Sequence, residues 1–519
     1  ANNLENDESK SNLSSTHGKE NALKLKKIYI VIANIAIILV LAFANIDHIF
    51  NGSALNIFKT ILFSIIIITI LFSINKLILN RISDKKKKII IRVGLAFFLF
   101  LEVISCIFFK VEYNWDFKWL MESAMEKAKT GNIEAIYYFK KFPNNLGALF
   151  IVTLAMKLAN NHVIGAYAAN ILFVFLSAVF TVLTARKIGG EKMGVNAIIL
   201  LIGFMPIYLN TPIVYTDSLS IAFPVAIFYF WILAKEQRER SKKKYYAYLL
   251  IMTILTVIAY TIKANAAIVC VAILIESIFN IKKLWKPILT MLVTFLILIK
   301  AISIYNCTFV LKDSSKNEFE FPLTHWVMLG LNKPESEGGT SIGYGAYSQE
   351  DADYTTIQPS YQDKVNANKI VIKQRLKDFG VKGYIEFLFK KFKYVWNDGS
   401  YYVLNTIGWD TINQNSMLYR LVLGDLSNKF VRPYMTYFND AIFILNLFLI
   451  IKKIIKRDMD EETRVIGTSI VGNAMFLLIW EARSRYIYLL IPLFVILAAM
   501  ELTDLSDNIK KIEERKNKM

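Results

Sequence analysis

The sequence predicts an all-α polytopic membrane protein. Of its 519 residues, 55% are hydrophobic, and the mean hydropathy is +0.40, which is more apolar than an ordinary soluble domain. The apolar residues form long runs separated by short polar segments, and Lys and Arg stand at the ends of these runs. Helices that cross a bilayer repeatedly show this arrangement.

Twelve apolar runs are candidates for membrane spans, since about 18 residues suffice to cross the hydrocarbon core and shorter runs occur inside bundles. They are 28–45, 57–79, 89–109, 163–184, 195–214, 219–234, 246–262, 265–280, 286–305, 433–451, 464–480 and 486–503. An even number of spans places both termini on one side. The run 28–45 also resembles the apolar region of a signal peptide, with Ala42 and Ala44 as a cleavage-like pair, so its removal stays open.

Charge decides the status of Pro143–Ala159, an apolar segment near the lower length limit for a span. If it crossed the membrane, the basic segments 81–88 and 235–244 would fall on opposite sides. Leaving it out places both on the cytoplasmic side, as the positive-inside rule favours. We therefore expect Pro143–Ala159 to be an interfacial or re-entrant helix.

Several function classes are disfavoured by composition. The net charge is +19, but the basic residues cluster at span ends, which indicates topology and contact with anionic lipid rather than nucleic-acid binding. Cys106, Cys270 and Cys307 have no CxxC spacing, so neither a disulfide framework nor a zinc site is indicated. No nucleotide-binding glycine motif occurs in a suitable setting.

The spans divide the chain into five regions. We expect a disordered cytoplasmic tail (1–27), two N-terminal spans (28–88), a transmembrane core (89–305) with an outer loop (110–162), an extracytoplasmic loop region (306–432), and C-terminal spans with a basic cytoplasmic tail (433–519). Within the fourth region, the Gly- and Ser-rich segment 336–354 predicts a flexible, exposed loop, and 365–396 predicts amphipathic helices on the membrane surface.

The first outer loop carries a candidate catalytic carboxylate, Asp116, directly after a predicted span. Behind it, apolar residues recur at helical spacing, which predicts an amphipathic helix lying along the membrane. They are Phe117, Leu120, Met121, Ala124, Met125 and Ala128. Asp116 on such a helix suits a general base at the membrane surface, although a solvated loop carboxylate is the simpler alternative.

A second group of charges lies at the same predicted outer face. Asp217 stands where one span turns into the next, and it serves either a site shared with Asp116 or the N-cap of the following helix. Lys263, Arg483 and Arg485 run against the positive-inside trend, so each needs a reason. One explanation is that they bind an anionic ligand such as phosphate. The alternative is that one of the two arginines pairs with Glu481.

Three further residues are candidates for substrate contact. Lys140 and Lys141 extend the possible anion site, although charges on an amphipathic segment are commonly solvated. His325, beside Trp326, suits contact with a sugar, whereas a lone histidine is more often a structural hydrogen bonder. For Tyr344, Trp396 and Trp409 of the same loop region, packing is the default assignment.

In order and sidedness, these motifs resemble the GT-C superfamily of membrane glycosyltransferases, including protein O-mannosyltransferases and lipid A aminoarabinose transferases. The matching segments are YNWDF, KKFPNNLG, YTDS, TIKANA and EARSRYIYLLIP, within residues 89–305 and 481–503, and FPLTHWVMLGLN in the outer loop. Two extra spans precede the first loop, and the KKFP element lacks the glutamate of the lipid A enzymes. The resemblance implies a GT-C-like bundle of about twelve spans with juxtamembrane helices in the first outer loop.

The resemblance also implies an inverting sugar transfer from a polyprenyl-phosphate donor to a glycan, lipid or protein acceptor, at the extracytoplasmic face of a bacterial cell membrane. Asp116 would act as general base, and Arg485, Arg483 and Lys263 would bind the leaving phosphate. A Mg²⁺ or Mn²⁺ ion on Asp116 or Asp217 would be optional. A flippase or transporter of lipid-linked sugars, and a polysaccharide polymerase or ligase, are the alternatives.

Overall fold

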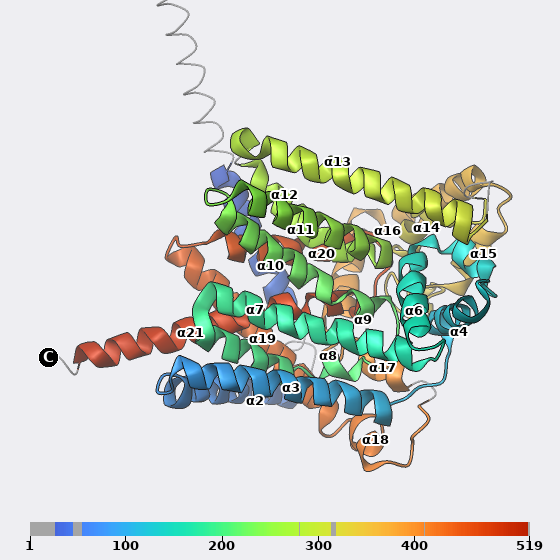
Figure 1. Cartoon of the computed structure of the whole chain (residues 1–519). Helices are drawn as coiled ribbons and strands as arrows, with labels where there is room; N and C mark the ends of the chain where they lie inside the picture. Colours follow the sequence, from blue (N-terminus) through green and yellow to red (C-terminus); the bar gives the residue numbers. More distant parts are fainter. Residues whose placement is uncertain (1–25, 45–53, 280, 313–317, 409–410, 517–519) are drawn as a thin grey trace, which may run out of the picture.

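The protein is built from helices throughout the part of the chain that the structure describes. The computed structural model describes residues 26–44, 54–279, 281–312, 318–408 and 411–516 (Figure 1). Within these ranges no strand forms, and the only extended pairings are isolated bridges between Val111 and Thr411 and between Pro334 and Ser341. The predicted all-α class is confirmed, while most of the predicted N-terminal tail lies outside the described residues.

Each predicted span coincides with a helix. Among the described residues, eight helices are long and apolar enough to cross a membrane. They are the helix Lys26–Ala44 and, with short extensions, α2 (Ala54–Ile74), α3 (Asp84–Phe108), α7 (Ile164–Gly203), α10 (Ala222–Gln237), α11 (Lys242–Ile262), α13 (Ile281–Tyr305) and α21 (Ile491–Lys516). The remaining predicted spans correspond to the shorter α12 (Ile268–Ile278) and to α19 (Val431–Ile455) and α20 (Glu461–Ile479).

Two predicted spans, 163–184 and 195–214, are combined in α7. The helix breaks at Gly189 and Gly190, and Gly190 has a φ of 74°, a conformation that a side chain disfavours. Beyond this break the chain reverses its direction, and Arg186 and Glu191 pair across it at 2.6 Å. The glycine pair therefore provides the sharp turn between two spans.

The bundle has a buried centre and a loosely held periphery. Helix α21 packs between α7 and α19, and 94% of its apolar window is buried. In α13, which packs along α11 and α12 at the edge of the bundle (Figure 1), the corresponding fraction is 6%. A helix with apolar side chains on all its exposed faces is stable only in a hydrocarbon environment, so α13 faces lipid.

The first outer loop folds into two short helices against the bundle, α4 (Trp115–Thr130) and α6 (Leu146–Leu158), joined through α5 (Ile136–Lys141). The predicted apolar stripe of α4 is largely buried, including Phe117 and Met121. At 13 residues, α6 is too short to span a membrane, in agreement with the exclusion of Pro143–Ala159 from the spans.

Residues 318–408 and 411–430 add a cover over the same end of the bundle (Figure 1). Its helices are α14 (Leu323–Leu329), α15 (Gln349–Thr356), α16 (Tyr361–Trp396, broken at Gly380), α17 (Val403–Gly408) and α18 (Met417–Val422). Figure 1 places α4, α6, α14 and α15 at one end of the molecule and the C-terminal end of α21 at the other.

One expectation about this cover is wrong. The segment 336–354 is not simply exposed, because it contains the buried carboxylate of Asp351. That group accepts hydrogen bonds from Arg375 at 2.8 Å and from Asn332 at 3.0 Å. Because a buried carboxylate must be paired, these contacts order a segment whose composition is typical of loops.

Candidate functional site

A buried ion pair joins two turns between spans. Asp217 lies in α9 (Thr216–Ser220), which follows α8 (Met205–Leu209), and Lys263 lies between α11 and the short turn Ala264–Ala267. Lys263 Nζ is 2.5 Å from Asp217 Oδ1, and their side chains are only 13% and 8% exposed. Burial lowers the pKa of Lys263, and the carboxylate of Asp217 opposes that shift. The N-cap of α9 is Tyr215, so Asp217 does not have the capping role that was the alternative for it.

Arg485 lies beside this pair in the turn Ser484–Leu490 and has few polar contacts of its own. Its Nε atom is 3.8 Å from Asp217 Oδ2. This Nε atom is buried and has no hydrogen-bond partner among the described residues. The guanidinium instead lies over the rings of Trp115, Tyr215 and Tyr486, with centroids at 5.2, 5.5 and 5.3 Å. Aromatic rings stabilise the cation without using its N–H donors, so the unbonded Nε donor remains available to an anion.

Tyr215 connects this region to the second carboxylate. Its hydroxyl donates a hydrogen bond of 3.0 Å to Asp116 Oδ2. Burial and the negative charge of Asp116 raise the pKa of Tyr215 well above its usual range, so the phenol stays protonated. Asp116 stands in the first turn of α4, next to Trp115, whose φ of 41° is unusual for a bulky residue. The strained residue carries the ring that supports Arg485.

We name Asp116, Tyr215, Asp217, Lys263 and Arg485 the charge cluster. Its members come from α4, from α9 and the residue before it, from the C-terminal end of α11, and from the turn that precedes α21. These segments lie together near one end of the bundle (Figure 1). The structure thus brings together Asp116, Asp217, Lys263 and Arg485, four of the residues singled out in the sequence. Tyr215, which links them, was not among them.

The neighbouring arginine has a different environment. Arg483 donates from Nη1 to the hydroxyl of Tyr402 at 3.1 Å and lies over the ring of Tyr402 at 5.1 Å. The expectation that Glu481 pairs with one arginine is wrong in the described part of the chain, since Glu481 Oε1 instead accepts a hydrogen bond of 2.9 Å from Tyr486. The two arginines of the Arg-Ser-Arg segment therefore contact different partners.

Asp398 ties these two environments together. Its Oδ2 accepts hydrogen bonds from the backbone of Tyr402 at 2.6 Å and from the Ser484 hydroxyl at 2.7 Å. Tyr401 and Tyr402 have φ values of 53° and 63°, and Asp398 holds this uncommon turn in place. The Asp-Gly-Ser sequence signals a turn, but its link to Ser484, next to Arg485, is not visible in the sequence.

Lys391 of α16 is the second residue that the sequence analysis missed. Its side chain is completely buried, and its ammonium donates to the carbonyl oxygens of Gly330 at 2.7 Å, Trp480 at 2.6 Å and Leu478 at 3.1 Å. Burial lowers the pKa of Lys391 to about 7. One cation thus joins the cover to the end of α20, immediately before the turn that carries Arg485.

The glycines around Lys391 make this approach possible. A Cβ atom on Gly345 would lie 2.4 Å from Lys391 Cε, and one on Gly330 would lie 2.3 Å from the carbonyl oxygen of Ile479. Backbone hydrogen bonds from Ala482 to Gly345 at 2.8 Å complete the contact. The cover therefore fixes the backbone that precedes the charge cluster.

The remaining sequence candidates lie in other surroundings. Lys141 donates to Thr356 at 2.9 Å, and Lys140 lies over the rings of Tyr137 and Phe319. His325 is fully buried with Nδ1 2.8 Å from the Thr355 hydroxyl. Burial lowers the pKa of His325 to about 3, so its ring is neutral. These contacts are those of a structural histidine and of lysines that support the cover.

The surroundings of Asp217 do not favour a divalent metal. In the described ranges no three His, Cys, Asp or Glu side chains are grouped to hold an ion. Asp217 is already occupied by the ammonium of Lys263 and faces Arg485, and these cations would repel a metal ion beside them.

Comparison with known proteins gives a family and two weak structural likenesses. A family model described as "Conserved hypothetical integral membrane protein" matches residues 19–505. No curated protein matches significantly. Crystal structures of ArnT from Cupriavidus metallidurans, bound to undecaprenyl phosphate and in the apo state, are similar at 12% and 13% identity. The similar region covers 79% of this chain and 77% and 76%, respectively, of the two ArnT chains. The TM-scores are 0.36 and 0.35.

Proposed function

We propose that this chain, which belongs to the family of conserved hypothetical integral membrane proteins, is an inverting glycosyltransferase that uses a polyprenyl-phosphate sugar. The observation that carries the proposal is the buried guanidinium of Arg485, which is supported by three aromatic rings and unbonded at Nε. It lies 3.8 Å from Asp217 and over the ring of Tyr215, whose hydroxyl donates to Asp116. The GT-C resemblance of the sequence supports the choice of donor.

Arg485 and Lys263 suit the phosphate of the donor. Arginine presents a planar set of N–H donors that matches phosphate oxygens, and in a buried site such contacts are stronger than in water. Asp217 holds Lys263 at 2.5 Å, so the pair carries no net charge and Arg485 supplies the positive charge. As the sugar leaves, negative charge grows on the phosphate, and preformed cations stabilise it without reorganising.

Asp116 suits the acceptor side of the same reaction. Its carboxylate takes the proton of the acceptor hydroxyl as that oxygen bonds to the sugar C1, and the C1–O bond to phosphate breaks with its electron pair leaving on the phosphate. The phenol of Tyr215 donates to Oδ2 and fixes the direction of the carboxylate. One displacement at C1 inverts its configuration.

The proposed setting is a bacterial cell membrane with the charge cluster on the extracytoplasmic side. The basic segments 81–88 and 235–244 support this orientation, because they lie at the ends of α3 and α10 that are remote from the cluster. Membrane lipids and a lipid-linked donor are then the partners, and the acceptor is a cell-wall glycan, a glycolipid or a protein.

A transfer assay in proteoliposomes tests the proposal. A panel of polyprenyl-phosphate sugars is offered with a membrane-lipid and cell-wall glycan extract, and release of the lipid phosphate is followed. We expect the Asp116→Asn variant to lose about 100-fold to 10,000-fold in rate, while binding of undecaprenyl phosphate is retained. Wild-type rates in a well-folded Asp116→Asn protein, or no binding of undecaprenyl phosphate by the wild type, would exclude the mechanism.

Transport of lipid-linked sugars is a second candidate, because one observation favours it. Glu102 of α3 and Asp440 of α19 are buried, and none of their carboxylate oxygens has a hydrogen-bond partner in the described structure. Ionisable groups inside membrane helices commonly mark transport pathways. If transport is the function, Glu102→Gln should abolish flipping of a fluorescent polyprenyl-phosphate sugar between leaflets. If the protein is a transferase instead, we expect no flipping by the wild type.

A further inference from the structure

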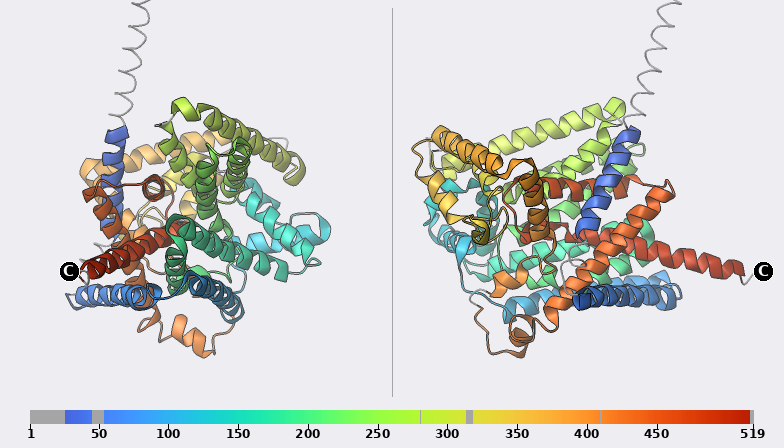
Figure 2. Two further views of the ribbon diagram at one scale, coloured as in Figure 1. Left: turned by 60° about the vertical axis from the view of Figure 1, so that its left-hand side comes forward. Right: turned by 180° about the vertical axis from the view of Figure 1, so that it is seen from behind.

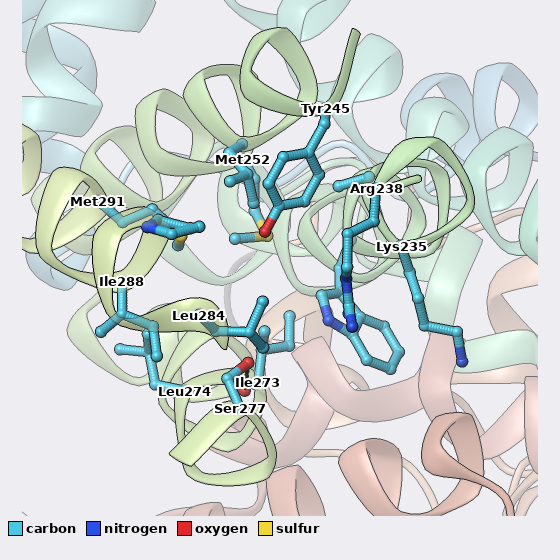
Figure 3. Close-up of a pocket in the computed structure, with 14 residues that line it drawn as sticks. Lys235, Arg238, Tyr245, Met252, Ile273, Leu274, Ser277, Leu284, Ile288 and Met291 are labelled. Carbon is cyan, nitrogen blue, oxygen red and sulfur yellow. Dashed lines mark hydrogen bonds between the residues drawn. The ribbon is translucent and has the colours of Figure 1, made fainter. Parts of the chain in front are cut away.

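A cavity lies at the opposite end of α10 from the charge cluster. It has a volume of about 30 Å³ and is lined by residues of α10, α11, α12 and α13 (Figure 3). Met252, Ile273, Ile288 and Met291 form its apolar walls, and Figure 3 shows Lys235 and Arg238 side by side along one edge. An apolar interior with cations at one edge matches the two chemical parts of a phospholipid.

The two cations differ in their pairing. Lys235 Nζ is 2.6 Å from Glu462 and 3.1 Å from Glu461, and it lies over the ring of Trp231 at 5.3 Å. Two carboxylates therefore neutralise it, and it is not available to a ligand.

Arg238 has no such partner. It forms no ion pair within the described ranges, and its Nε is buried without a hydrogen bond. A guanidinium donor removed from water without an acceptor is unfavourable, and a phosphate oxygen is an acceptor that arginine binds well. The Arg238 guanidinium thus presents an open donor at the cavity edge.

The outer surface of α13 shows how deep the cavity lies in the membrane. Trp285 is 50% exposed with Lys286 over its ring at 5.4 Å, whereas the following turns expose Leu289, Leu292 and Leu296. Tryptophan and lysine mark the interface between headgroups and hydrocarbon. The cavity, lined by Leu284 and Pro287 of the same helix, therefore lies at headgroup depth.

We propose that Arg238 and this cavity bind the headgroup phosphate of an anionic phospholipid from the leaflet that faces the basic end of the bundle. The phosphate accepts from the Arg238 guanidinium, and the acyl chains lie along the exposed surface of α13. A lipid at this place secures α13, whose main contacts among the described helices are with α11 and α12. This site is separate from the transferase and does not depend on it.

Native mass spectrometry of the full chain from nanodiscs tests the site, with equal amounts of phosphatidylglycerol and phosphatidylcholine as probes. The wild type should retain phosphatidylglycerol preferentially, and Arg238→Gln should lower that retention about tenfold, the effect of losing one charged hydrogen bond. Arg240→Gln is the matched control, since Arg240 is exposed two residues away. Arg238→Lys, which keeps the charge, guards against misfolding and should retain part of the binding.

Three results would overturn the proposal: unchanged phosphatidylglycerol retention in folded Arg238→Gln, equal retention of phosphatidylcholine by the wild type, or an equal loss in Arg240→Gln. The last result would indicate a diffuse attraction of lipid to the basic surface rather than a site.

Discussion

Two ion pairs at opposite ends of the helical bundle differ in how far they are removed from water. At the basic end, Lys187 and Glu236 pair at 2.8 Å with side chains that are 36% and 35% exposed. In the charge cluster, the side chains of Lys263 and Asp217 are only 13% and 8% exposed. Exposed pairs contribute little to stability, whereas a buried charge must be compensated. The comparison teaches that burial, and not separation along the chain, decides how much each pair contributes to stability.

Removing one member of each pair gives the largest expected contrast. Asp217→Asn leaves Lys263 buried without its carboxylate, so the free energy of unfolding should fall by about 3–5 kcal/mol. Glu236→Gln removes half of the exposed pair and should change it by about 0.5 kcal/mol or less. Unfolding in mixed micelles measures both, and similar losses would remove the distinction between the two ends.

The rate of sugar transfer should also depend on the charge cluster and not on the basic end. Arg485→Met removes the guanidinium that faces the proposed phosphate, and we expect a loss of about 100-fold to 1,000-fold in the rate of sugar transfer. Lys187→Met, at the basic end, should leave the rate unchanged. Equal rates in wild type and a folded Arg485→Met protein would show that the cluster is structural only.

A pH titration examines how the cover is attached to the cluster. The pKa of Lys391 is about 7 in the folded protein and near 10.5 in an unfolded chain, so the unfolded state binds more protons between these values. Stability should therefore fall as the pH is lowered from 10 to 7, by about 1 kcal/mol per pH unit. The difference between wild type and Lys391→Met isolates this effect.

Lys390→Met serves as the control for Lys391→Met, since Lys390 is exposed and pairs with Glu337 at 2.8 Å. Identical pH slopes in wild type and Lys391→Met would mean that the buried ammonium does not titrate in this range.

The smallest effect on stability is expected for the hydrogen bond between Arg483 and Tyr402. Tyr402→Phe keeps the ring under Arg483 and removes only the hydroxyl that accepts from Nη1. We expect a loss of about 0.5–1.5 kcal/mol in unfolding free energy, the usual contribution of one hydrogen bond, and an unchanged affinity for undecaprenyl phosphate. A large fall in that affinity would place Arg483 in the same phosphate site as Arg485.

The helices were predictable because hydrophobic length and charge bias are local properties of the sequence. The same properties identified the amphipathic α4 and excluded Pro143–Ala159 from the spans. Glycine and serine content misassigned 336–354, because the ion pair that orders it, between Asp351 and Arg375, joins residues 24 positions apart. Composition does not record such a pairing.

The sequence by itself determined the membrane class, the helix positions and the five charged residues that contradict the positive-inside trend or stand at span ends. Only the tertiary structure decided that Asp116, Asp217, Lys263 and Arg485 meet through Tyr215, while Arg483 turns to Tyr402. It alone showed that Lys391 and Asp398 hold the backbone beside Arg485. The physical reason is that desolvation and hydrogen bonding depend on which side chains surround a charge, and those neighbours are set by packing between segments far apart in the chain.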